Sequence, residues 1–330
     1  CALCSRVNPW PVSNNSGLPN NHVNCLATCG PDLFAGTDGS GVFVFTRDRV
    51  GWTAVNSGLP EQTGTSCLLA SGLNLFAGAE RSGVFLSTND GTSCAAICSG
   101  LPWELEVNCL LASGSNLVAG TKKGIYLSRN NGANWTRANS GLLDEVSIHC
   151  LVKSGPNLVA GADMGIFLSA DDGLSWAAIK TGLPEETQIT SLAVSGTILY
   201  AAIREDVFRS TDNGTSWTIA NRKLPKHAWI SCLAANGSNL FAGIYAPAVA
   251  DGKIIVKNPK GLGVLRSVDK GANWEAINSG LPAKVRITCI AMHGTGLFVG
   301  TREDGVFLST DNGGRRKPCN SGLPKKTSVS

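Results

Sequence analysis

The sequence predicts an all-β fold, a seven-bladed β-propeller of four-stranded antiparallel blades, on three observations. A phrase of five residues, Asn-Ser-Gly-Leu-Pro or a variant of it, occurs eight times at intervals of 41 or 42 residues, apart from one interval of 57. Each interval contains four short apolar and β-branched runs separated by Gly, Asn and Asp. No window shows the 3.6-residue period of an amphipathic helix. Four strands repeated seven times are typical of a propeller, whereas the rungs of a β-solenoid are shorter.

The repeat divides one domain, residues 1–330, into seven expected blades. The third residue of each phrase marks their boundaries, which gives 17–58, 58–100, 100–141, 141–182, 182–223, 223–280 and 280–322. The sixth unit is longer because it holds an insertion of about sixteen residues, roughly Tyr245 to Gly261, in the loop between its second and third strands.

Within a unit the four runs follow in a constant order. The first resembles residues 23–26, the second residues 74–78 and the third residues 83–87, and the fourth is centred on Trp, as at residues 135–139. Gly-containing turns separate them, so consecutive runs are expected to pair as antiparallel hairpins.

The two ends of the chain are expected to close the ring by pairing. The last unit ends in the run 315–319, which lacks Trp and contains Pro318, whereas residues 8–13 resemble a fourth strand without a blade. A strand from the N-terminal segment would help to complete blade seven and leave no edge strand open.

The turn between the third and fourth runs carries the motif Ser-x-Asp-x-Gly-x-x-Trp. The Asp side chain accepts backbone N–H groups across such a turn, the Gly supplies a positive φ, and the Trp buries a large area between blades. The motif is complete in three units and keeps its Ser, Asp and Gly in the seventh, which makes these aspartates structural: Asp171, Asp212, Asp269 and Asp311.

This turn resembles the Asp-box (BNR-type) repeat of sialidases, xyloglucanase-type glycosidases, sortilin-like receptors and photosystem II assembly-factor propellers. The resemblance covers about residues 17–324. It implies the architecture and not the activity, because the Asp box is a structural turn in all of these families. An extracellular or periplasmic location is what the resemblance favours.

Function is expected on the face that breaks the repeat. In a four-stranded meander, the 2–3 loops and the connections between blades share one face, and loops on a rigid scaffold are where binding residues gather. Connections of units two to five are acidic, and those of units six and seven are basic. The candidate ligand-binding residues of this face are Trp103, Glu104, Glu106, Asp144, Glu145, Glu185, His227, Trp229 and Arg286.

A ring of polar residues is expected on the innermost strands, one before each repeated Cys: Asn24, Ser66, Asn108, His149, Thr190, Ser231 and Thr288. The simplest interpretation is a hydrogen-bonded layer around the axis. His149 is its one titratable member, and we add it to the candidate ligand-binding residues.

Six of the twelve cysteines occupy one repeat position, and a whole blade separates each from the next, so we expect free thiols that pack between inner strands. Cys94 and Cys98 bracket one extended strand and lie too far apart to bridge. The sequence leaves open the disulfide state of Cys1, Cys4, Cys29 and Cys319, of which Cys1 or Cys4 would approach Cys319 if the termini pair.

The composition and the absence of several motifs argue against a number of functional classes. A net charge of +4 in 330 residues implies no strong nucleic-acid field, and no apolar run is long enough for a membrane span. Metalloprotease, α/β-hydrolase, P-loop and dinucleotide fingerprints are absent, as is the Arg-Ile-Pro signature of sialidases.

We therefore predict a non-catalytic, monomeric propeller that binds a carbohydrate or a protein partner. The alternative is a hydrolase, a glycoside hydrolase or a metal-dependent lactonase, that uses carboxylates of the same face. A structural or assembly scaffold is the third interpretation. No cofactor is required, and Ca²⁺ is the ion that Asp-rich turns would suit, although each turn supplies few of the six to eight oxygens that Ca²⁺ takes.

Overall fold

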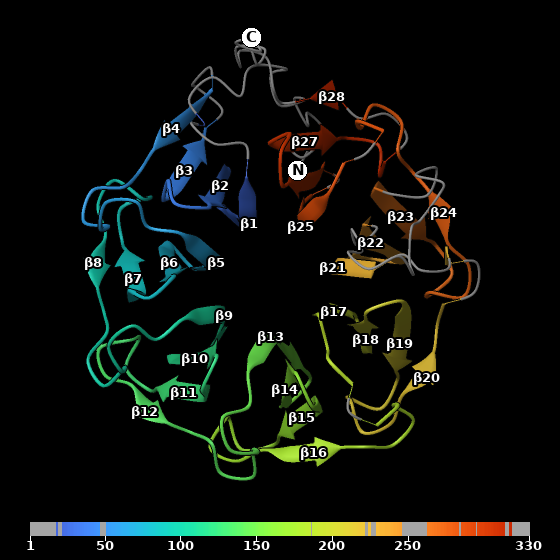
Figure 1. Cartoon of the computed structure of the whole chain (residues 1–330), viewed down its shortest axis with the longest axis horizontal. Coiled ribbons are helices and arrows are strands. Elements are labelled where there is room, and N and C mark those ends of the chain that lie inside the picture. The colour runs from blue at the N-terminus through green and yellow to red at the C-terminus, as the bar shows by residue number, and fades with distance from the viewer. Residues whose placement is uncertain are drawn as a thin grey trace, which may run out of the picture.

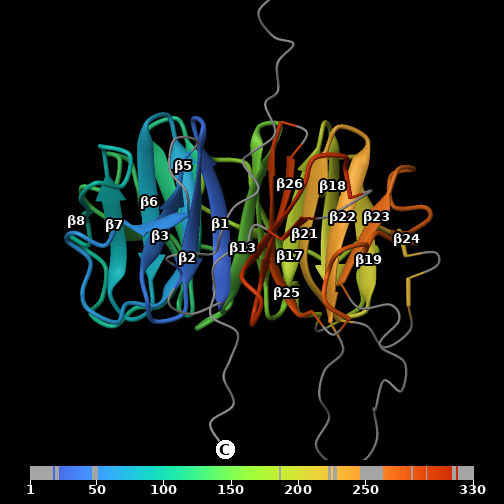
Figure 2. The same ribbon diagram turned by 90° about the horizontal axis from the view of Figure 1, so that it is seen from above.

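The computed structural model is a ring of seven four-stranded antiparallel sheets, each a meander in sequence order (Figure 1). It describes residues 18, 22–46, 51–185, 187–221, 224–225, 229–245, 263–283, 285–294, 296–313 and 317–318, and these contain no helix. The predicted fold class is confirmed. Seen from the side, the strands run along the axis of the ring (Figure 2).

The strands of the first four blades are β1 (Val23–Cys29), β2 (Asp32–Thr37), β3 (Val42–Phe45), β4 (Trp52–Ala54), β5 (Thr65–Ser71), β6 (Asn74–Ala79), β7 (Gly83–Ser87), β8 (Ala95–Ala96), β9 (Val107–Ser113), β10 (Asn116–Thr121), β11 (Gly124–Ser128), β12 (Thr136–Arg137), β13 (Ile148–Ser154), β14 (Asn157–Ala162), β15 (Gly165–Ser169) and β16 (Ala177–Ile179). Those of the last three are β17 (Ser191–Ser195), β18 (Ile198–Ile203), β19 (Asp206–Ser210), β20 (Thr218–Ile219), β21 (Trp229–Asn236), β22 (Asn239–Tyr245), β23 (Gly263–Ser267), β24 (Glu275–Ala276), β25 (Ile287–His293), β26 (Gly296–Thr301), β27 (Val306–Ser309) and β28 (Lys317–Pro318).

The core lies between neighbouring blades. The second strand of each blade is buried on both faces and the short outer strands are exposed, so the sheets stack face to face around the ring. Trp176 of blade four, for example, packs with Val118 and Ile125 of blade three. The indole N–H of Trp135 donates to the carbonyl of Ile97 in the preceding blade at 2.7 Å. Burial of these indoles is what the repeated Trp contributes to the fold.

A bulge in the innermost strand recurs at the predicted polar ring. In six blades the pairing register shifts at the residue before the repeated Cys, which leaves that residue outside the ladder. The freed side chain can reach the next blade: Asn108 Nδ2 donates to the carbonyl of Ile148 at 2.9 Å, and Asn24 Nδ2 to that of Thr65 at 3.3 Å. Thr190 of blade five, where the register does not shift, donates to the carbonyl of Ile230 at 3.1 Å. This ring is therefore mainly a set of latches between blades.

The ring is closed by contact between blades one and seven. Thr288 Oγ1 donates to the carbonyl of Val23, and Phe298 packs into one core cluster with Leu33. Blade seven takes its fourth strand, β28, from the C-terminal unit, through the pair Leu308–Lys317. The predicted N-terminal strand, residues 8–13, lies outside the described residues.

The repeated cysteines are free and pack as predicted. Cys67 and Cys232 are buried, and a Cβ added to Gly78 would lie 2.4 Å from Cys67 Sγ, so the thiol fills the space that the Gly leaves. Cys94 and Cys98 are not bridged. Cys29 is free and donates to the carbonyl of Gly72 at 3.6 Å. Cys1, Cys4 and Cys319 lie outside the described residues.

Candidate functional site

The loop-rich face carries the 2–3 loops and the connections between blades. Next to the axis of the ring, each blade contributes one pair of facing residues to this face, seven pairs in all. We call these pairs the inner rim. In each pair, one residue lies two positions before the polar-ring residue of the innermost strand, and the other lies at the end of the second strand or directly after it. Backbone hydrogen bonds of 2.8 to 3.3 Å join five of the pairs, and a sixth is part of the β21–β22 ladder. The pairs, in blade order, are His22–Asp38, Gly64–Glu80, Glu106–Lys122, Ser147–Asp163, Gln188–Arg204, Trp229–Tyr245 and Arg286–Arg302.

Blades one and three pair their own rim side chains. His22 Nδ1 lies 2.9 Å from Asp38 Oδ2, and Lys122 forms an ion pair with Glu106. Exposed ion pairs contribute at most about 1 kcal/mol to stability. Their consequence here is local: these four side chains bind one another, which leaves fewer of their polar groups for a ligand.

Blades four and five build a polar cluster from three side chains. His149 does not latch to the next blade as Asn108 does; its Nε2 lies 2.6 Å from Asp163 Oδ1. Gln188 Nε2 donates to the same Asp163 oxygen at 2.9 Å, and lies 3.4 Å from His149 Nε2. Both groups bind one carboxylate oxygen, so the cluster fixes the carboxylate at the junction of the two blades.

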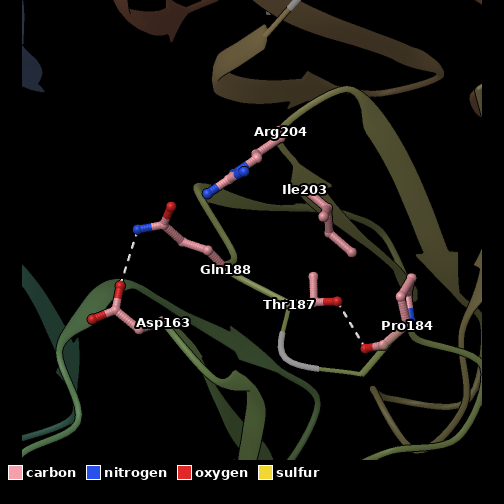
Figure 3. Close-up of a pocket in the computed structure, with 6 residues that line it drawn as sticks. All are labelled: Asp163, Pro184, Thr187, Gln188, Ile203 and Arg204. Atoms are coloured by element: carbon pink, nitrogen blue, oxygen red, sulfur yellow. Dashed lines mark hydrogen bonds between the residues drawn. The ribbon is translucent and has the colours of Figure 1, made fainter.

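A pocket of about 440 Å³ opens beside this cluster (Figure 3). Asp163 lines it from blade four, and Arg204 and Ile203 from blade five. The connection between the blades supplies Pro184, Thr187 and Gln188. The Thr187 hydroxyl donates to the carbonyl of Pro184 at 2.7 Å, and this hydrogen bond holds the two ends of the turn in the connection together. The side chains of Gln188 and Arg204 extend toward the same space (Figure 3).

Arg204 joins the pocket to a row of stacked side chains across blades five to seven. Its Cζ lies 5.4 Å from the centre of the Trp229 ring. Trp229 meets Tyr245 edge to face, with ring centres 6.0 Å apart at 75°. Arg286 Cζ lies 5.7 Å from the centre of the Tyr245 ring, and Arg302 is its rim partner. Guanidinium groups over aromatic faces are held by cation–π attraction, about 0.5–1 kcal/mol each when exposed.

The structure brings together some of the predicted site residues and separates the rest. His149, Trp229 and Arg286 lie in the arc of blades four to seven described above. Trp103, 90% exposed, stands on the connection between blades two and three, so three blades separate it from Trp229. His227 lies outside the described residues.

The predicted acidic residues do not form one site. Glu104, Asp144 and Glu145 are exposed on their connections, and Glu106 is held by Lys122. Glu185 lines a neighbouring groove of about 560 Å³ together with the half-exposed Leu143 and Met164. No carboxylate pair with a shared pocket emerges from this set within the described residues.

Metal binding and carboxylate catalysis are the two chemical alternatives to ligand binding at this face. The described residues hold no cluster of three or more His, Cys, Asp or Glu that could bind a metal ion. The pKa of Asp304 is raised, first by burial and then by the charge of Glu303, yet Asp304 does not line the described pocket. Asp163 is the one carboxylate among the described lining residues of that pocket.

Five members of the arc are absent from the predicted candidates. Asp163, Arg204 and Arg302 belong to the 2–3 loops of the face on which the sequence placed function, but they were not chosen among its candidates, and Gln188 and Tyr245 carry no motif. A signal was available in the repeat: in six blades, the rim pair lies two residues before the bulge and two residues after the conserved Gly of the second strand. In blade five, Ala202 takes the place of that Gly and the register does not shift.

Comparison with known proteins shows the fold alone. No family model and no curated protein matches the chain. A GH74 xyloglucanase from Xanthomonas campestris matches it with a TM-score of 0.72 at 17% identity, over 92% of this chain and 55% of the enzyme. The extracellular domain of BT4673 from B. thetaiotaomicron matches at 0.69 and 15%, over 89% and 39%.

A size-matched neighbour is YCF48 from Cyanidioschyzon merolae, with a TM-score of 0.65 and 16% identity, over 88% of this chain and 96% of that one. YCF48 has also been solved bound to D1 peptide, and that structure matches at 0.66 and 13%. The neighbours thus include a xyloglucanase, an extracellular domain and YCF48, all β-propellers, and this chain spans about half of the xyloglucanase. The described residues contain no helix long and apolar enough to cross a membrane.

Proposed function

We propose that this propeller binds a saccharide-sized ligand, without turning it over, in the pocket between blades four and five. The observation that carries the proposal is the convergence of a carboxylate, an amide and a guanidinium, from Asp163, Gln188 and Arg204, on one concave space of about 440 Å³. Volumes of this order and a few convergent polar groups are typical of small-ligand sites. These three groups also offer the paired donors and acceptors that sugar hydroxyls require.

The chemistry of the described lining supports binding without turnover. A glycoside hydrolase of the usual kind needs two carboxyl groups about 5–9 Å apart across the bond that it cleaves. The described pocket has Asp163 alone, and His149 and Gln188 both hold its Oδ1. The hydrolase alternative therefore has no described carboxylate pair to act with.

Calorimetric titration with cellohexaose, a xyloglucan heptasaccharide and oligogalacturonate tests the proposal. Asp163→Ala should weaken binding of whichever saccharide binds by about tenfold, the equivalent of about 1.4 kcal/mol, because it removes an acceptor and frees Gln188. The matched control is Glu80→Ala, which changes the same rim position in blade two. Loss of binding in the control with none in Asp163→Ala, or no binding of any saccharide by the unaltered protein, would overturn the proposal.

A peptide partner is the second candidate, and one comparison favours it. YCF48, which is close to this chain in length and fold, has been solved with D1 peptide. A peptide ligand would be expected to occupy the same loop-rich face, since the repeat breaks down there. Titration with an acidic and a neutral peptide, beside the saccharides, separates the two candidates.

A further inference from the structure

We infer that the ligand of this pocket is an acidic oligosaccharide, whose uronate carboxylates bind the guanidinium groups of Arg204, Arg286 and Arg302. The inference rests on the proposed function and narrows it to one class of saccharide. It is carried by the uneven charge of the inner rim, by the stacking of two of the arginines and by the position of Asp163.

The rim cations divide into two kinds. In blades one and three each cationic or titratable rim residue faces a carboxylate, as Lys122 faces Glu106. In blades five and seven the rim presents Arg204, Arg286 and Arg302, and among the described residues none of these three forms an ion pair. Glu205 and Glu303 follow two of these arginines on the same loops, so the cationic groups are confined to the rim positions themselves. There, three guanidinium groups without a facing carboxylate favour an anion.

Stacking prepares two of these groups to receive a carboxylate. Arg204 lies over Trp229 and Arg286 over Tyr245, so each guanidinium plane is held while its edge N–H groups stay available. A planar guanidinium edge binds a carboxylate through two parallel hydrogen bonds. Arg204 and Arg302 are both exposed to solvent, so a ligand on the loop-rich face can reach them.

Asp163 distinguishes a saccharide acid from a purely acidic peptide. It lines the same pocket as Arg204, and its described hydrogen bonds all use Oδ1. An acidic peptide would have to turn backbone N–H groups toward Asp163 to keep its carboxylates away from that charge, whereas a uronate carries hydroxyl donors on the same ring as its carboxylate. A uronate offers both groups that this pair needs, hydroxyl donors for Asp163 and a carboxylate for Arg204.

The arc is longer than one sugar ring. Arg204 belongs to blade five and Arg286 to blade seven, and the Trp229–Tyr245 pair of blade six lies between them, with successive contacts of 5.4, 6.0 and 5.7 Å. A ligand that engages both arginines must carry at least two acidic residues. This points to an oligomer, such as oligogalacturonate, rather than a monosaccharide.

The experiment is a titration with oligogalacturonate, its methyl ester, cellohexaose and a poly-glutamate peptide at low and high salt. The methyl ester is the matched probe because it keeps the hydroxyl groups and removes the charge. We expect the acid to bind at least about tenfold more tightly than its ester, and less tightly at high salt. Arg204→Ala and Arg286→Ala should each weaken binding by about tenfold or more. Arg286→Lys should recover part of the loss, because it keeps the charge without the planar fork.

Lys122→Ala is the control, because Lys122 holds the rim position of Arg204 in blade three and should leave affinity unchanged. Equal binding of acid and ester would overturn the inference while the proposed function stands. Stronger binding of poly-glutamate than of oligogalacturonate would overturn it in favour of an acidic peptide. If no saccharide binds, the inference and the proposed function fail together.

Discussion

The Ser-x-Asp-x-Gly turns show how single side chains hold the edges of the blades. Asp171 Oδ2 accepts the hydroxyl proton of Ser175 at 2.6 Å, and Oδ1 accepts the backbone N–H of Ser175 and the hydroxyl of Ser169 at 2.9 and 2.8 Å. These bonds favour the charged form and lower the pKa of Asp171 to about 2. Asn89 of blade two builds the same turn with an amide, which donates to Ser93 Oγ at 2.9 Å.

Acid should weaken the wild-type turn and spare an asparagine variant. The folded pKa of Asp171 lies below the unfolded value of about 3.9, so its contribution is present above about pH 4 and is lost as pH falls toward 2. Asp171→Asn should keep the turn at neutral pH, as Asn89 does, and show a shallower loss of the free energy of unfolding between about pH 4 and 2. Urea denaturation measures this. Asp172→Asn, beside it, is the control, and an Asp171→Asn variant with the wild-type acid slope would contradict the argument.

At the scale of elements, the repeated phrase clamps each blade to the next. Asn139 Oδ1 accepts the N–H of Ile125 in its own blade at 2.7 Å. The following Ser140 carbonyl accepts the N–H of Trp176 in blade four at 2.9 Å. Gly141, the next residue of the phrase, has a φ of 82°. A Cβ added to it would lie 1.9 Å from the carbonyl oxygen of Trp176. Gly58, Gly100 and Gly182 meet the next blade in the same way.

Gly141→Ala should therefore destabilise the protein more than an alanine at an unconfined glycine. The added Cβ meets backbone, which cannot move without separating the two blades, so we expect a loss of more than about 2 kcal/mol in the free energy of unfolding. Gly114→Ala is the control: its φ is 64° but nothing lies within 4 Å of the new Cβ, and the strain alone should cost about 1 kcal/mol. Equal losses in urea denaturation would mean that the clamp is not tight.

For the whole molecule, the decisive feature is that seven similar units close on themselves. The inner strands meet through latches such as those of Asn108 and Thr190, and through thiols such as that of Cys67, which donates to the carbonyl of Val107 in the next blade at 3.8 Å. Burial raises the pKa of Cys67 and Cys150 to about 12 and that of Cys232 to about 11. A thiol that is both buried and protonated is a poor nucleophile.

Alkylation should therefore report ring opening. At pH 8 we expect Cys67, Cys150 and Cys232 to stay unlabelled by iodoacetamide in the folded protein and to be labelled fully in denaturant. Mass spectrometry of the digested peptides measures the labelling of each thiol. Cys94, which is half-buried and lies outside the inner strands, provides the internal comparison and should be labelled sooner. Labelling of Cys67 at one rate in both states would show that the inner ring is open to solvent.

The predictions from sequence succeeded where one unit could be compared with the next. The blades, their strand order and the unbridged ring cysteines all follow from repetition, whereas the latches that residues such as Asn108 form between blades were found only in the structure. The candidate site was predicted less well. His149, Trp229 and Arg286 take part in the arc, whereas Trp103 and Glu104 stand on a connection three blades away from Trp229.

By itself, the sequence determined the all-β propeller, the order of its strands and the face on which the repeat breaks down, because these depend on patterns that recur within one chain. Only the tertiary structure decided which side chains meet. Asp163 joins Gln188 across a blade boundary, and Arg204 reaches Trp229 across another. Such contacts depend on the register within each blade and on the packing angle between blades, which bring together residues that share no motif and lie 25 positions apart in both pairs.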